Sequence, residues 1–129
     1  MVLPADGSQA RRGTLIDLDP VIHAPVRLRI VSLLAAVEEA EFGFVRDAVG
    51  VSDSVLSKHG SALEAAGYVQ LRKGYVGKRP RTWYRLTDLG RTAFRTYVSH
   101  LQEIVSTSGL TVLQPEATPP VGNPASGVP

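Results

Sequence analysis

Two groups of side chains in this sequence have types and spacings suited to binding an anionic polymer. The first is a set of cations interleaved with glycine, tyrosine and proline, and it consists of Arg72, Lys73, Lys78, Arg79 and Arg81. The second is a row of small hydroxyls with one lysine, recurring at intervals of three and four residues: Ser54, Ser57, Lys58 and Ser61. Guanidinium and ammonium groups bind phosphate, and short hydroxyls come close enough to hydrogen-bond phosphates or base edges.

The charge of the chain is polarised, although its net value is only +2. The segment from Gly67 to Arg91 contains seven basic residues and one acid, Asp88, which leaves it at +6. The rest of the chain contains the other seven basic and eleven acidic residues and therefore carries −4. A local excess of this size predicts a positive patch that attracts phosphate.

The residue types do not indicate catalysis, metal binding or insertion in a membrane. The chain has no cysteine, so disulfides and thiolate metal sites are excluded. The histidines, His23, His59 and His100, lie far apart, and no nucleophile, histidine and carboxylate are grouped at useful spacing. We therefore predict neither an enzyme nor a metal or cofactor site. The longest apolar run, Leu33 to Val37, is too short to span a bilayer, and we expect a cytoplasmic, nucleoid-associated protein without a membrane partner.

The elements that position the hydroxyl row are two short helices joined by a tight turn. A scaffold helix beginning near Val26 is predicted first, after a turn at residues 20–23, and a brief edge strand at Glu41-Phe42 follows it. A short helix is then expected over 43–49. Gly50 ends this helix, and the turn of 50–52 has the length found between the two helices of a helix-turn-helix.

The second helix of that pair is predicted over 53–66, with Ser52 as its cap and as a further candidate for contact with nucleic acid. Apolar residues such as Leu56 and Leu63 form one side, and the hydroxyl row with Lys58 forms the other. A surface of small hydroxyls fits a major groove, although an ordinary solvated helix face has the same pattern. The decision between the two rests on the neighbouring elements.

A hairpin follows the helix. Apolar and polar residues alternate in Tyr68 to Lys73 and again in Thr82 to Leu86, which predicts two half-buried strands. Between them Gly74 to Arg81 is predicted as a basic loop, because it contains two glycines, a proline and several cations. Such a loop is suited to lie along a phosphate backbone or to insert an arginine into a minor groove.

The last helix is predicted from about Leu89 to Val105, with Thr87-Asp88 at its start. Its apolar seam consists of Phe94, Tyr97, Val98, Leu101, Ile104 and Val105. Six such residues exceed what one small domain is expected to cover, so we predict that this helix pairs with its copy in a homodimer. Packing on the first helix of the same subunit is the competing interpretation.

These elements define one α+β domain over 18–105, mainly α with a small antiparallel β-hairpin. Residues 1–17 lack apolar periodicity and are predicted to be a flexible lead-in. Residues 106–129 are rich in proline, glycine, serine and threonine and are predicted to be a disordered tail.

The succession of elements from Leu18 to Val105 resembles the bacterial winged helix-turn-helix transcriptional regulators of the MarR, ArsR and PadR kind, and most closely the small winged-helix DNA-binding domain family. The resemblance is carried by Leu56-Ser57-Lys58-His59 and by Leu63, Glu64, Gly67, Tyr68, Val69, Lys73, Arg79, Pro80, Arg81, Thr82, Trp83, Tyr84, Leu86, Thr87, Gly90 and Arg91. It covers about two-thirds of the chain.

The resemblance implies a homodimeric regulator, and specifically a repressor, that binds double-stranded DNA at a pseudo-palindromic operator. The helix over 53–66 is then the recognition helix in the major groove, and residues 74–81 are the wing. An effector ligand between the dimer helices is common among such regulators, but no residue pattern here identifies one. The alternative, from a different class, is a winged-helix module whose basic hairpin docks an acidic protein partner.

The sequence departs from the family pattern at Gly60 and Ser61, where relatives commonly have an apolar residue and a basic one, so one expected phosphate contact is missing. Glycine inside a helix costs roughly 1 kcal/mol relative to alanine. We therefore predict that Gly60 permits a neighbouring helix to approach closely.

Overall fold

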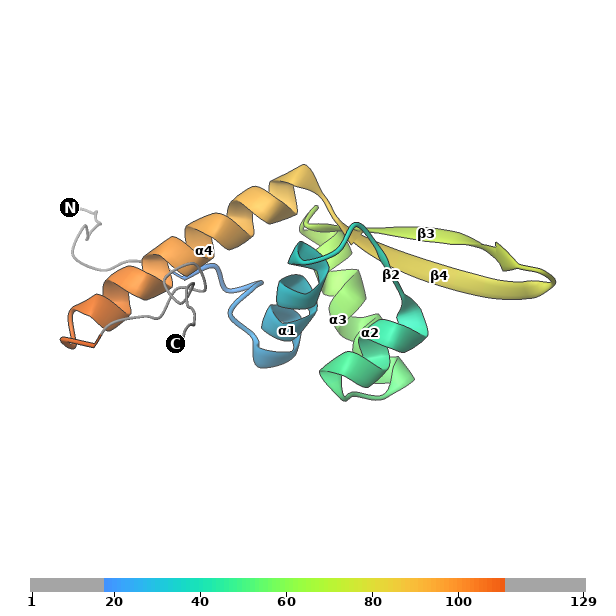
Figure 1. Ribbon diagram of the computed structural model, residues 1–129, viewed down its shortest axis with the longest axis horizontal. Helices are drawn as coiled ribbons and strands as arrows, with labels where there is room; N and C mark the ends of the chain where they lie inside the picture. The colour runs from blue at the N-terminus through green and yellow to red at the C-terminus, as the bar shows by residue number, and fades with distance from the viewer. Residues whose placement is uncertain (1–17, 111–129) are drawn as a thin grey trace, which may run out of the picture.

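A computed structural model describes residues 18–110 of the chain. Its elements, in chain order, are α1 (Pro25–Ala35), β2 (Ala40–Glu41), α2 (Phe42–Val49), α3 (Asp53–Ala65), β3 (Val69–Val76), β4 (Arg79–Leu86) and α4 (Asp88–Ser106). Helices α1 to α3 form a central body, from which α4 extends to one side and the β3–β4 hairpin to the other (Figure 1). The predicted lead-in of 1–17 and residues 111–129 of the predicted tail lie outside the described residues.

A turn at the start of the described chain closes one side of the core. Ile22 is fully buried there. Asp19 holds the turn in place, since its carboxylate accepts from the Val21 amide at 2.9 Å and from the Tyr68 hydroxyl at 2.5 Å. The α1 helix begins at Pro25, whose missing N–H costs nothing in a first turn. The predicted turn and scaffold helix are both present.

The helix-turn-helix forms as the sequence predicts. Gly50 ends α2 in the left-handed conformation with φ 82°, and its amide donates to the Arg46 carbonyl at 2.8 Å. Ser52 then caps α3, because its hydroxyl accepts from the Val55 amide at 3.2 Å. The observed α3 ends at Ala65, one residue before the predicted end.

Three antiparallel strands form one sheet in the order β2-β4-β3, so the last strand of the chain is the central one. The edge strand β2 pairs Ala40 with Tyr84 and Glu41 with Trp83. It comes one residue earlier than predicted, because Phe42 already belongs to α2. The close succession leaves no linker between the sheet and the helix-turn-helix.

The predicted basic loop of 74–81 is wrong as a loop, because most of it is strand. The β3–β4 ladder continues to the pair Val76–Arg79, and only Gly77 and Lys78 form the turn, with Gly77 at φ 64°. Glycine and proline are ordinarily loop signals. Here Gly74 lies against the Trp83 ring, and Pro80 lies in the part of β4 that extends past β2, where a missing N–H is tolerated.

Gly60 does permit a close approach, but the neighbour is a strand residue and not a helix. A Cβ at this buried position of α3 would lie 2.7 Å from the Tyr84 hydroxyl and 3.0 Å from two ring carbons. Tyr84 is 2% exposed and joins the core formed by α1, α2, α3 and the sheet. The missing side chain is therefore what allows β4 to dock on α3.

The start of α4 is locked to the start of the hairpin. The Thr87 hydroxyl accepts from the Gly90 amide at 2.9 Å and donates to the Gly67 carbonyl at 2.6 Å. Gly90 is buried against the Tyr68 backbone, where no Cβ fits. Arg91 donates to the carbonyls of Ala35 and Val37 at 3.1 and 3.2 Å, and so ties α4 to the end of α1.

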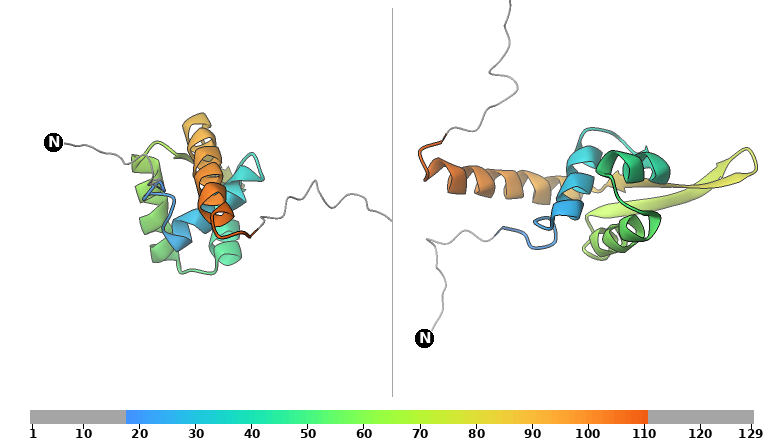
Figure 2. Two further views of the ribbon diagram at one scale, coloured as in Figure 1. Left: turned by 90° about the vertical axis from the view of Figure 1, so that its left-hand side faces the viewer. Right: turned by 90° about the horizontal axis from the view of Figure 1, so that it is seen from below.

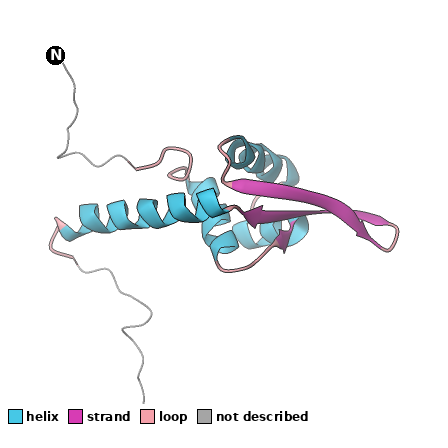
Figure 3. Cartoon of the chain, turned by 90° about the horizontal axis from the view of Figure 1, so that it is seen from above, coloured by secondary structure: helices cyan, strands magenta, loops and turns pink. Residues whose placement is uncertain are grey.

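The apolar seam of α4 divides along its length. Tyr97 is buried in its own subunit, where its hydroxyl lies 2.8 Å from His23 Nδ1, and Phe94 packs on the core. The second half of the helix extends away from α1 (Figure 3), and Ile104 there is 41% exposed. Packing within the subunit therefore accounts for Phe94 and Tyr97. No helix within residues 18–110 is long and apolar enough to cross a membrane.

Candidate nucleic-acid interface

The exposed side of α3 carries the predicted hydroxyl row. Ser54, Ser57, Lys58 and Ser61 are all exposed, whereas Leu56, Gly60 and Leu63 are buried on the opposite side. The buried side rests on the core, so it fixes which residues of α3 face outward. The structure thus brings the predicted α3 residues together on one surface.

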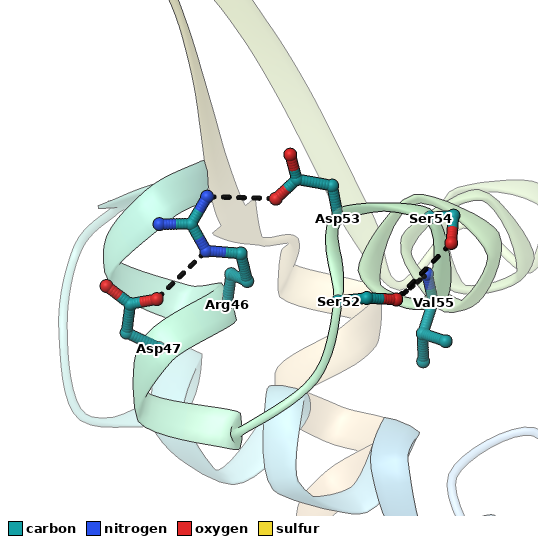
Figure 4. A network of polar contacts seen from close by, with 6 residues as sticks. All are labelled: Arg46, Asp47, Ser52, Asp53, Ser54 and Val55. Atoms are coloured by element: carbon teal, nitrogen blue, oxygen red, sulfur yellow. Dashed lines mark hydrogen bonds and ion pairs between the residues drawn. The ribbon is translucent and has the colours of Figure 1, made fainter.

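The two helices of the helix-turn-helix are also joined by polar contacts (Figure 4). Arg46 of α2 donates to Asp47 and to Asp53 at the start of α3, both at 2.9 Å. Hydrogen bonding from Arg46 lowers the pKa of the Asp47 carboxyl, and the two carboxylates raise the pKa of Arg46. Ser52, a predicted contact residue, uses its hydroxyl as the cap and lies 3.3 Å from the Ser54 hydroxyl.

A histidine anchors α3 to the N-terminal turn. Arg27 donates to His59 Nδ1 at 3.1 Å and to the Val21 carbonyl at 2.5 Å. Because Nδ1 accepts from a cation, this contact requires the neutral ring. Burial lowers the pKa of His59, and the charges of Arg27 and Lys58 lower it further.

The hairpin presents two different faces, because residues directly opposite in an antiparallel ladder lie on the same side of the sheet. The helix-facing face is the one on which Tyr84 docks against α3, and its exposed residues are Lys73, Tyr75 and Pro80, with Thr82 half-buried beside them. The outer face is the opposite one, and it consists of Gln70, Arg72, Gly74, Val76, Arg79, Arg81, Trp83 and Arg85. The right-hand view of Figure 2 shows the hairpin from the side of α2 and α3.

This division separates the predicted wing cations. Lys73 lies on the helix-facing face and lines a cleft of about 840 Å³ between the hairpin and α2, and Arg81 of the outer face reaches the same cleft. Lys78 is at the tip. Arg72, Arg79 and Arg81 belong to the outer face, so the structure does not bring all five cations to one surface.

Two of the outer-face arginines already hold carboxylates. Arg72 donates to both oxygens of Glu39, at 3.2 and 2.6 Å, and its guanidinium lies 4.1 Å from the centre of the Trp83 ring. This hydrogen bonding lowers the pKa of Glu39 and raises that of Arg72. Arg81 pairs with Glu41 at 3.1 Å. Both pairs are partly exposed and are therefore weak restraints.

Sequence reasoning missed the carboxylates and the aromatic ring of this face. Glu39 and Glu41 flank the buried Ala40 in β2, and both acids therefore share the side of the sheet that carries Trp83. The available signal was the alternation in β4, where arginine or tryptophan occupies every second position from Arg79 to Arg85. Assigning 74–81 to a loop concealed this alternation.

Comparison with known proteins places these features in a family. The model of the winged helix DNA-binding domain matches residues 26–105. The chain belongs to this family. An uncharacterized protein from Methanocaldococcus jannaschii is 29% identical over 84 residues, which cover 65% of this chain and 91% of that protein.

Several solved structures share this fold, and some of them are described as transcriptional regulators. The transcriptional regulator homologue from Pyrococcus horikoshii OT3 is 28% identical, with a TM-score of 0.66 over 70% of this chain and 89% of that one. NolR from Sinorhizobium fredii is 29% identical, with a TM-score of 0.51 over 65% and 76% of the two chains. A MarR-family regulator from Enterococcus faecalis V583, 22% identical, shares the fold with a TM-score of 0.59 over 69% and 82%. The predicted winged-helix fold and the predicted winged-helix DNA-binding domain family are confirmed.

Proposed function

We propose that this protein is a transcriptional regulator that reads double-stranded DNA with α3 in the major groove. The helix-facing face and the tip of its hairpin would contact the DNA phosphate backbone. The observation that carries the proposal is the exposed side of α3, where four polar side chains able to reach DNA stand on a helix whose other side is fixed in the core. Ser54, Ser57 and Ser61 would contact base edges, and Lys58 would contact phosphate.

The proposed backbone contacts of the hairpin are Lys73 and Lys78. Both are exposed, and neither forms an ion pair with another described residue. Arg72, Arg79 and Arg81 point from the outer face and are not part of the proposed contact set. In this proposal the hairpin contacts DNA only through its helix-facing face and its tip.

The dependence of affinity on salt tests these contacts. Affinity falls as salt rises, and each phosphate contact makes the slope of log affinity against log salt concentration steeper by about 0.9. We expect each of three variants to make the slope for a mixed-sequence duplex shallower by about that amount: Lys58→Ala, Lys73→Ala and Lys78→Ala. Fluorescence anisotropy of a labelled duplex at several salt concentrations measures it.

The matched control is Arg95→Ala, which removes the same charge from an exposed position on α4. Its slope should equal that of the wild type. If Arg95→Ala and the three lysine variants lower the slope equally, binding reflects overall charge and the assigned surface is wrong. Ser57→Ala should instead leave the slope unchanged and alter the preference among duplex sequences selected from a random pool.

We further propose that the protein acts as a homodimer through the second half of α4, formed by Val98, Leu101, Ile104 and Val105. These residues support the proposal because they are half-buried or exposed although apolar, whereas Phe94 and Tyr97 are used within the subunit. Leu101→Glu should convert a dimer to a monomer in sedimentation experiments without loss of helical content. Glu103→Gln, on the same turn, is the control. A monomeric wild type would contradict the proposal.

Repression is the expected direction of regulation. Mapping the bound sites in the cell and measuring transcription from those promoters after deletion of the gene tests it. Transcription should rise, because a repressor that occupies a promoter is then removed. A fall would identify an activator.

A further inference from the structure

The outer face of the hairpin is a charged surface that the proposed DNA contacts do not use. It carries four arginines, Arg72, Arg79, Arg81 and Arg85, on alternate positions of two paired strands. Helices α2 and α3 lie on the other side of these strands, where Tyr84 packs against Gly60. The outer face is therefore on the side of the sheet opposite to the helices that carry the proposed major-groove contacts.

This face binds carboxylates within the protein itself. Glu39 accepts two hydrogen bonds from the guanidinium of Arg72, and that guanidinium stacks on the Trp83 ring. Glu41 occupies Arg81. A planar guanidinium fork that is stacked on an aromatic ring and paired with a carboxylate is a well-formed anion receptor.

The two internal carboxylates do not neutralise the face. Arg79 and Arg85 are exposed and form no ion pair with any residue among 18–110. Arg85 lies near enough to Glu39 for its charge to help lower the pKa of that carboxyl. Four arginines against two glutamates leave an excess of positive charge on a surface already shaped for carboxylates.

We propose that the outer face is a docking surface for an acidic polypeptide segment of a partner protein, separate from the surface that contacts DNA. Alternate residues of a strand are about 6.6 Å apart, so Arg79, Arg81 and Arg85 match acidic residues spaced by two and by four positions in an extended segment. Glu39 and Glu41, which are themselves two residues apart in an extended strand, occupy part of this surface in the free protein and compete with the partner.

The probe for this proposal is a labelled decapeptide that alternates glutamate with serine, compared with its glutamine counterpart. Anisotropy with the full-length protein at low salt should show binding of the glutamate peptide only. The double variant Arg81→Ala/Arg85→Ala should weaken binding by about tenfold. Glu39→Gln/Glu41→Gln should tighten it by several fold, because the internal competitors are gone.

Two controls separate this surface from general charge and from DNA binding. Arg95→Ala and Lys73→Ala should each change peptide affinity by less than about twofold. A saturating DNA duplex should not displace the peptide. The proposal is overturned if Arg95→Ala weakens peptide binding as much as Arg81→Ala/Arg85→Ala does, if Glu39→Gln/Glu41→Gln binds the peptide no more tightly than the wild type, or if the duplex displaces the peptide. Failure of DNA binding by the wild type would refute the proposed function but leave this result intact.

Discussion

The α3 helix and the β3–β4 hairpin hold their exposed side chains in place by different means. The buried side of α3 is locked in the core, where Gly60 allows Tyr84 to rest directly on the helix. In the hairpin, by contrast, every residue from Tyr75 to Pro80 is exposed. This exposed part is held by the strand ladder, and two surface ion pairs join the rest of the hairpin to Glu39 and Glu41.

The difference suggests a division of roles. A side chain on a helix whose other face is buried has a fixed position, which the reading of base edges requires. An exposed hairpin with few buried contacts moves more readily, and contacts with phosphate or with an acidic segment tolerate that movement. We therefore expect substitutions in the two regions to differ in kind, and three comparisons test this.

The largest difference in stability is expected between two glycine-to-alanine variants, one in α3 and one in the hairpin. Gly60→Ala places a Cβ against the buried Tyr84 ring and should destabilise the fold by about 1–3 kcal/mol, although alanine is the better helix former. Gly74→Ala meets the partly exposed Trp83 ring at 3.2 Å, which can shift, and should change stability by less than about 0.5 kcal/mol. Urea unfolding followed by circular dichroism measures both.

A second-site change shows whether the Tyr84 contact is the cause. Tyr84→Phe removes the oxygen nearest the new Cβ and should recover part of the stability lost in Gly60→Ala. Equal losses at Gly60 and Gly74, or additive effects of Gly60→Ala and Tyr84→Phe, would contradict the docking of β4 on α3.

An intermediate effect is expected from His59, which joins α3 to the N-terminal turn. Its pKa is lowered in the folded protein, so the unfolded chain binds the proton more readily. Stability should therefore be constant above the ordinary histidine pKa of about 6.5 and fall as the pH drops below it. His59→Gln keeps an acceptor for Arg27 and should reduce this fall in melting curves at several pH values. The same acid dependence in His59→Gln would place its origin elsewhere.

The smallest effect should appear in the hairpin, at the exposed pair of Arg72 and Glu39. Lysine keeps the charge of Arg72 but cannot donate in a planar fork or stack flat on Trp83. Arg72→Lys should therefore raise the pKa of Glu39 toward its ordinary value, as measured by NMR titration of the side chain. The pair contributes stability above the ordinary glutamate pKa, and this contribution is lost as the pH falls through the lowered pKa. An unchanged Glu39 pKa would show that the fork does not hold the carboxylate.

Local signals in the sequence were enough for the helix-turn-helix and for the start of α4. Gly50, Ser52 and Thr87 each act through bonds to residues close in the chain, so their roles as helix stop and caps could be predicted. The hairpin was harder, because Gly74 and Pro80 act as loop residues in most contexts. Only the pairing with the opposite strand shows that both fit within the ladder.

The sequence by itself determined which residues are helical, where the helices end and that positive charge collects after Gly67, because periodicity, capping and composition act over a few residues. The tertiary structure decided which residues share a surface. Strand pairing placed Arg72 beside Trp83 on one face of the sheet, and packing brought Glu39 onto Arg72 and set Tyr84 against Gly60. Contacts of this kind join residues far apart in the chain, and no local pattern specifies them.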